Sequence, residues 1–126
     1  MRIIAPPLGN CYNTGNSNHT EGADIMLTFE RVFETFADYL AGDADREIVK
    51  VRHGYLSLLW DNNMGEYVSF MFCQTPEELL NELASNYTGY LEWQLCADKD
   101  KPTEAECAEV AEKVAEIRAK CLDGLN

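Results

Sequence analysis

The stretch EIVKVRHGYLSLLWDNNMGEYVSFMF, residues 47–72, decides the fold. Its three parts, 47–53, 55–60 and 67–72, alternate between the two sides of a strand and are rich in β-branched and aromatic residues, which is typical of β-strands. A single glycine separates the first two parts, and the turn-forming DNNMGE separates the last two. Because such short connections join antiparallel neighbours, the stretch predicts a three-stranded antiparallel meander.

Helical patterns flank these strands. Upstream, apolar residues recur at three- and four-residue steps from Ile25 to Leu40, and Gly42 favours a helix end. Downstream, TPEE at 75–78 and TEAE at 103–106 each match a capping box, the signature of a helix start. The order is therefore α-β-β-β-α-α. It predicts the α+β class, with a two-layer domain in which helices pack on the meander.

The apolar residues of each predicted strand assign one sheet face to the core. The predicted core comprises Phe29, Phe33, Phe36, Val49, Val51, Leu58, Trp60, Phe70, Phe72, Leu83, Val114 and Ile117. The opposite face is expected either to be covered by other segments or to act as a contact surface; it carries Tyr55, Ser57, Leu59, Tyr67, Ser69, Met71, Lys50 and Arg52. Gly89 is expected to break or kink the first of the two C-terminal helices.

The chain of 126 residues fits one domain with an N-terminal extension. Residues 6–22, PPLGNCYNTGNSNHTEG, are rich in Pro, Gly, Asn, Ser and Thr and predict a loop or arm. Residues 1–5 are compatible with a short edge strand. We therefore divide the chain into an N-terminal arm or loop, residues 1–22, and a single α+β domain, residues 23–126.

Acidic residues dominate the charge. The chain has 22 Asp and Glu against 10 Lys and Arg, a net charge of -12, and residues 53–98 contain no Lys or Arg. A field of this sign repels phosphate backbones and anionic membranes, so direct binding to nucleic acid or to a membrane is not expected. A basic protein is the expected partner, and a charge that only keeps the domain soluble is the alternative.

The sequence suggests a cytoplasmic protein. No stretch approaches the roughly 18 apolar residues that span a membrane, and the N-terminus MRIIAPPLGN lacks the apolar core of a signal peptide. The five cysteines, an odd number, fit a compartment in which thiols stay reduced. The oligomeric state is left open, and a dimer is compatible with the sequence.

No metal, cofactor or catalytic site is predicted. The cysteines and histidines lack the close pairs that zinc sites show. No nucleophile is oriented beside His19 or His53. The phosphate-binding motifs G-x-x-x-x-G-K-[ST] and G-x-G-x-x-G are both missing. We therefore expect a protein that is not an enzyme and that carries no cofactor.

The α-β-β-β-α-α order over residues 24–123, the small size and the acidic excess resemble the compact anti-CRISPR proteins that block the nuclease Cas9. The resemblance implies an inhibitor that imitates the negatively charged DNA flanking the target and fills the site that reads this DNA. The resemblance rests on element order and charge and on no shared motif, so it assigns no role to an individual residue of this chain. The long N-terminal arm and the five cysteines depart from that pattern.

These observations favour an acidic, DNA-mimic-like inhibitor that blocks a basic nucleic-acid-handling protein, such as a CRISPR effector nuclease. Turns project charge furthest from the core, so the expected contact residues are Asp61, Glu66, Glu92, Asp98, Asp100 and Glu104. Two alternatives remain. One is an immunity protein or antitoxin that neutralises a basic toxin, and the other is a dimeric scaffolding module.

Overall fold

The predicted strands form the meander that the sequence indicates. The computed structural model describes residues 2–4, 26–96 and 100–125. Its elements are β1 (Arg2–Ile4), α1 (Phe29–Thr35), α2 (Ala37–Gly42), β2 (Arg46–Val51), β3 (Gly54–Asp61), β4 (Glu66–Cys73), α3 (Pro76–Leu95) and α4 (Glu104–Leu122). The pairs β2–β3 and β3–β4 are antiparallel. The α+β class and the three-stranded antiparallel meander are therefore confirmed.

A fourth strand extends the sheet at its other edge. Residues 2–4 pair in parallel with residues 47–49 of β2, so the sheet order is β1-β2-β3-β4. The short edge strand expected near the N-terminus is thus present as β1. The predicted loop or arm at residues 6–22 lies outside the described residues.

Both predicted capping boxes are present. The Thr75 hydroxyl accepts a hydrogen bond from the Glu78 backbone N–H (3.2 Å), and the Glu78 carboxylate accepts one from the Thr75 N–H (3.3 Å). Thr103 and Glu106 form the same reciprocal pair at the start of α4. The break expected at Gly89 is wrong, because α3 runs through this residue without interruption. Packing of its apolar stripe outweighs the cost of one interior glycine, about 1 kcal/mol.

The helix expected upstream of the strands is divided into two. α1 begins after Thr28, whose hydroxyl accepts a hydrogen bond from the Arg31 N–H (3.1 Å). The chain leaves the helical conformation at Phe36 (φ -97°, ψ 14°) before α2 starts. Phe36 is fully buried, so the break between the two helices coincides with an anchor in the core.

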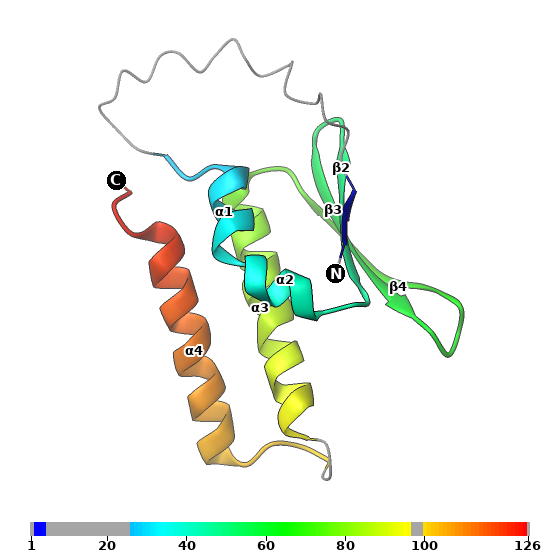
Figure 1. Cartoon of the computed structure of the whole chain (residues 1–126), viewed down its shortest axis with the longest axis vertical. Helices are drawn as coiled ribbons and strands as arrows, with labels where there is room; N and C mark the ends of the chain where they lie inside the picture. Colours follow the sequence, from blue (N-terminus) through cyan, green and yellow to red (C-terminus); the bar gives the residue numbers. More distant parts are fainter. Residues whose placement is uncertain (1, 5–25, 97–99, 126) are drawn as a thin grey trace.

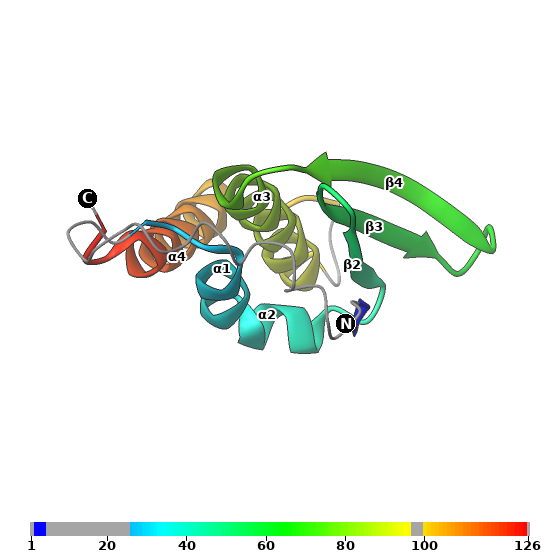
Figure 2. The ribbon, with the colours of Figure 1, turned by 90° about the horizontal axis from the view of Figure 1, so that it is seen from above.

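Helices and sheet form two layers. Figures 1 and 2 show α1, α2 and α3 on one side of the sheet, with α4 beside α1 and α3. Tyr55 of β3 makes ring contacts with both Phe29 and Phe33 of α1, at centroid distances of 4.8 and 4.9 Å. The face of the sheet that carries Tyr55 is therefore the face that the helices cover.

The core lies between these layers. Its cluster of buried residues comprises Val32, Phe36, Tyr39, Leu40, Ile48, Cys73, Leu79, Leu80, Leu83, Ala84 and Cys121. The helical part of the predicted core is right, since Phe36 and Leu83 are buried and Phe29, Phe33, Val114 and Ile117 pack against the cluster.

The predicted core face of the sheet is wrong. Ile48 of β2 and Cys73 of β4 are fully buried on the helix side. The strand residues assigned to the core, namely Val49, Val51, Leu58, Trp60, Phe70 and Phe72, lie on the opposite face. Phe70 is 66% exposed and Phe72 is 46% exposed. Alternation identified which residues share a face, but both faces carry apolar residues, and the approach of α1 and α3 decides which one is buried.

Most residues that were predicted to lie on the open face of the sheet lie instead on the side that the helices cover. Tyr55, Ser57, Leu59, Ser69, Met71 and Lys50 lie there by register, and Arg52 lies in the β2–β3 turn. Tyr67 is the exception. An irregularity in the β3–β4 pairing places Leu59 opposite Ser69 but Trp60 opposite Tyr67, which moves Tyr67 to the other face.

A buried thiol and two buried tyrosine hydroxyls predict that the stability of the fold decreases at alkaline pH. Burial raises the pKa of the Cys73 thiol from 9.0 to about 11, with smaller contributions from Glu82 and Glu78. Burial also raises the pKa of the hydroxyls of Tyr39 and Tyr55. These groups ionise more readily in the unfolded chain, so their stabilising effect is complete below the unfolded pKa and is lost as the pH rises through the folded one. We expect the urea concentration at the unfolding midpoint to decrease as the pH rises from 9.0 to about 11.

The control for this pH dependence is Tyr39→Phe, which removes one of the three ionisable groups. Its midpoint should decrease less steeply over the same pH range than that of the unmodified chain. A midpoint that stays constant throughout this range would contradict the burial of these groups.

Candidate functional site

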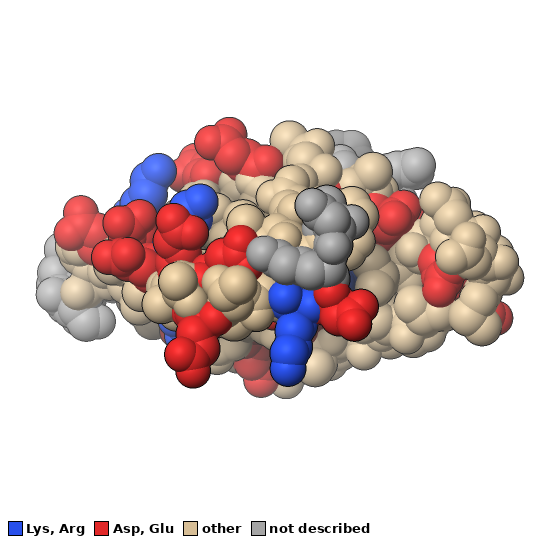
Figure 3. Space-filling model, turned by 90° about the horizontal axis from the view of Figure 1, so that it is seen from below, with Lys and Arg blue, Asp and Glu red and all other residues tan. Residues whose placement is uncertain are grey.

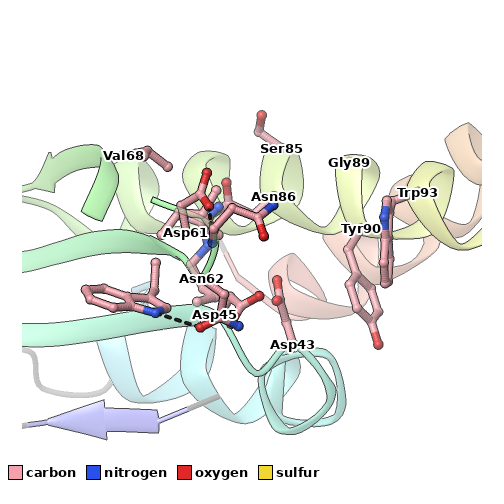
Figure 4. A pocket seen from close by; sticks show the side chains of 14 residues that line it. Asp43, Asp45, Asp61, Asn62, Val68, Ser85, Asn86, Gly89, Tyr90 and Trp93 are labelled. Atoms are coloured by element: carbon pink, nitrogen blue, oxygen red, sulfur yellow. Dashed lines mark hydrogen bonds between the residues drawn. The ribbon is translucent and has the colours of Figure 1, made fainter. Parts of the chain in front are cut away.

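A hollow of about 520 Å³ lies where the start of β2, the β3–β4 turn and α3 meet (Figure 4). We call it the acidic hollow. It is lined by Asp43, Asp45, Arg46, Leu59, Trp60, Asp61, Asn62, Asn63, Val68, Ser85, Asn86, Gly89, Tyr90 and Trp93. Its volume falls within the range of about 300–1,000 Å³ that is usual for ligand pockets.

Local structure places the three carboxylates of the acidic hollow. Asp43 follows α2 as its C-cap and accepts a hydrogen bond from the Tyr39 hydroxyl (2.6 Å). The carbonyl of Asp45 accepts from the backbone N–H of Trp60 (2.9 Å), which ties the segment before β2 to the end of β3. Asp61 accepts from the backbone N–H groups of Asn63 and Met64 (2.8 and 3.1 Å) and so organises the hairpin turn.

Arg46 is the basic residue in the lining of the acidic hollow, and it is 7% exposed. Its Nη1 donates to the Ser57 hydroxyl (3.1 Å) and lies 3.9 Å from the Glu82 carboxylate. Asn86 donates to Glu82 (3.1 Å) and to Ser57 (3.4 Å), which completes a small polar cluster between β2, β3 and α3. Glu82 thus compensates the Arg46 charge beneath the surface, and the three aspartates keep the hollow acidic.

Aromatic rings of α3 border the acidic hollow. Trp93 is 72% exposed, and its ring centroid lies 6.4 Å from that of Tyr90 at an interplanar angle of 30°. The Tyr90 hydroxyl donates to the Gly42 carbonyl (3.3 Å) and links α3 to the end of α2. The exposed Trp93 ring presents apolar surface to water beside the carboxylates. Tryptophan is among the residues that contribute most binding energy at protein interfaces.

The predicted contact residues do not form one patch. Asp61 lines the acidic hollow, and Glu66 is its partner across the end of the hairpin. Glu92 precedes the exposed Trp93 on α3 and is half-buried, whereas Asp100 and Glu104 are exposed where α3 connects to α4. Figure 1 shows the β3–β4 turn at the right side of the molecule and the start of α4 at the bottom. Asp98 lies outside the described residues.

Sequence reasoning missed Asp43, Asp45 and Trp93. The signal for the two aspartates was the D-x-D spacing directly after the helix-ending Gly42. No local pattern indicated Trp93, because an aromatic residue on a helix is usually taken for part of the core. Pairing of β2 with β3 brings the two aspartates to Asp61, and the packing of α3 on the sheet adds Trp93.

Acidic side chains are unevenly distributed on the surface. Figure 3 views the molecule from the end where α3 connects to α4, and most of the visible Asp and Glu side chains lie over the helices. The surface over the β3–β4 hairpin is mostly uncharged in this view. The exposed Glu109, Glu112 and Glu116 of α4 form no ion pair with any Lys or Arg of the described chain.

The second distinctive surface is the side of the sheet away from the helices. We call it the open sheet face, and it consists of Val49, Val51, Leu56, Leu58, Trp60, Tyr67, Phe70 and Phe72. Its rings are in contact, since Tyr67 lies 5.0 Å from Trp60 and 6.5 Å from Phe70 between centroids. Phe70 and Phe72 keep about half or more of their surface exposed. An apolar surface of this kind is characteristic of a contact site.

In the part of the chain that the structure describes, no group of three or more His, Cys, Asp and Glu side chains is arranged to hold a metal ion. Within the same residues, no helix combines the length and the apolar character needed to cross a bilayer. No protein family model, curated protein or solved structure matches this chain.

Proposed function

We propose that this protein is a non-enzymatic inhibitor that binds a basic, nucleic-acid-handling protein in the cytoplasm and occupies the site of its nucleic acid. The observation that carries the proposal is the acidic hollow, in which three aspartates and an exposed tryptophan border one space. In this proposal the hollow takes up Lys or Arg side chains that otherwise contact phosphates.

The chemistry of the acidic hollow suits a cationic side chain. Carboxylates accept charge-assisted hydrogen bonds from guanidinium and ammonium groups, and Arg binds them in a bidentate manner. The exposed ring of Trp93 offers a face for a cation–π contact, which contributes about 0.5–2 kcal/mol. A neutral or acidic partner would leave the aspartates without compensation, which disfavours binding.

The net charge of -12 supports a partner that normally binds nucleic acid. A protein that binds a phosphate backbone presents a positive surface, and an acidic protein reaches that surface by electrostatic steering. The resemblance to anti-CRISPR proteins makes a CRISPR effector nuclease the first partner to test. Competition with DNA follows from shared use of the same positive surface.

The test begins with capture of the partner. The purified chain is immobilised and exposed to a nuclease-treated bacterial lysate, and the bound protein is then assayed for duplex DNA binding with and without this chain. We expect a basic protein whose DNA binding is lost when this chain is added. A neutral partner, or one that binds DNA and this chain at the same time, would overturn the proposal.

Charge removal in the acidic hollow then locates the contact. The triple variant Asp43→Asn, Asp45→Asn and Asp61→Asn keeps the size and one accepting oxygen of each of these side chains. We expect its association rate with the partner to fall about tenfold or more at low salt, because steering by the hollow is lost.

The matched control for this charge removal is Glu109→Gln, Glu112→Gln and Glu116→Gln on α4, which changes the net charge by the same amount. If it slows association as much as the hollow variant does, binding depends on overall charge and the hollow is not the contact. In addition, Trp93→Ala should speed dissociation of the complex about tenfold.

A further inference from the structure

We propose that the open sheet face is covered by a second copy of this chain, so that two sheets pack face to face in a symmetric dimer. The described helices are all on the other side of the sheet, and no described element packs on this one (Figure 2). The open sheet face shares Trp60 with the lining of the acidic hollow but otherwise consists of different residues, and the proposal holds or fails without any partner protein.

The size of the open sheet face is sufficient for a weak but specific interface. Phe70 and Phe72 are 66% and 46% exposed, and the other six residues of the face are partly exposed. An aromatic side chain buries about 150–250 Å² when it is fully covered, and the residues of this face are only partly exposed, so the face offers on the order of 500 Å² per copy. Two copies together then bury roughly 1,000 Å², which reaches the lower bound for a specific protein interface.

The charge of the open sheet face favours a second copy over a partner recognised by charge. Glu47 is the charged residue on this side of β2, and its two carboxylate oxygens accept hydrogen bonds from the Tyr67 hydroxyl (2.9 and 3.0 Å). The molecule carries -12 overall, yet two copies that meet through this face bring few charges together. A basic partner gains no electrostatic attraction from such a surface, and in the proposed function it binds at the acidic hollow.

The geometry of the sheet allows this arrangement. Sheets pack face to face about 10 Å apart, with side chains of the two inner faces interdigitating. Around a two-fold axis, each copy presents the same patch to the other, as isologous interfaces require. The dimer would thus have four layers, helices–sheet–sheet–helices, in which the strands of each copy are covered on both sides.

Edge pairing is the competing arrangement. β4 is an outer strand of the sheet formed by the described residues, and its apolar residues do not protect it against pairing with another strand. Two copies that pair through β4 would leave Leu58, on the inner strand β3, uncovered. A charge at Leu58 therefore separates the two arrangements.

The test is the mass of the purified chain by sedimentation equilibrium over a range of concentrations. We expect a species of twice 14.2 kDa that dissociates on dilution. Phe70→Lys and Leu58→Lys should each raise the dimer dissociation constant about 10- to 100-fold, because each removes an apolar contact of the interface. Trp93→Ala, which removes an equally exposed aromatic ring outside the open sheet face, should leave it unchanged.

Circular dichroism melts of each variant verify that the monomer is folded. If Leu58→Lys fails to fold, Phe70→Lys carries the test alone, since Phe70 is already mostly exposed in the monomer. A mass of 14.2 kDa at every concentration would overturn the proposal. So would a dimer that survives a folded Leu58→Lys variant, which would indicate edge pairing, or a dimer that survives Phe70→Lys.

Discussion

Phe36→Ala is expected to lower the free energy of unfolding by about 3–5 kcal/mol. Phe36 is fully buried at the junction of α1 and α2, and its ring lies 6.4 Å from that of Tyr87 on α3. Truncation leaves a cavity in a place where three helices meet, and the surrounding backbone can close it only in part. Chemical denaturation at neutral pH measures the change.

The matched control for Phe36→Ala is Phe70→Ala, which truncates the same side chain on the open sheet face. In the monomer, at concentrations too low for self-association, it should cost about 0.5 kcal/mol or less, as is usual for exposed positions. Equal losses for the two variants would mean that Phe70 is buried in the monomer and would contradict its exposure on the open sheet face.

Glu82→Gln is expected to destabilise the protein by about 3 kcal/mol, because it leaves the buried guanidinium of Arg46 without a compensating charge. Arg46 Nη1 lies 3.9 Å from Glu82, and the buried Nε of Arg46 has no hydrogen-bond partner among the described residues. The 3.9 Å separation is long for an ion pair, so we expect the lower end of the usual range of about 3–5 kcal/mol for breaking a buried pair. Urea unfolding of the variant measures the loss.

The double variant Arg46→Met, Glu82→Leu tests the origin of that loss. It removes both charges and keeps apolar volume in the layer between sheet and helices, so much of the lost stability should return. If the double variant loses as much stability as Arg46→Met and Glu82→Leu lose separately when added together, the two charges do not depend on each other.

Local patterns predicted the elements better than their arrangement. The capping boxes at Thr75 and Thr103 and the alternation of the three strands led to helices and strands in the right places. The helix expected from Ile25 to Gly42 was divided because the burial of Phe36 outweighs the continuity of the helical pattern. The helix-breaking effect expected of Gly89 was also too strong, because tertiary packing overrides local helix propensity.

The candidate site was predicted only in part. Asp61 was recognised as a turn carboxylate, but the residues that meet it in the acidic hollow come from the segment before β2 and from α3. Their juxtaposition depends on contacts between parts of the chain that are far apart in sequence. The pattern of a single strand or helix carries no information about such a neighbour.

By itself, the sequence determined the α+β class, the antiparallel order of β2, β3 and β4, the starts of α3 and α4, and the acidic field of the molecule. These depend on alternation, turn chemistry, capping and composition, which act within a few residues or on the whole chain. Only the tertiary structure decided which sheet face is buried. Both faces of the meander are apolar enough for a core, and the contacts of Tyr55 with α1 and of the Arg46 cluster with α3 place one of them inside. Phe70 and Phe72 are left on the side that the helices do not cover.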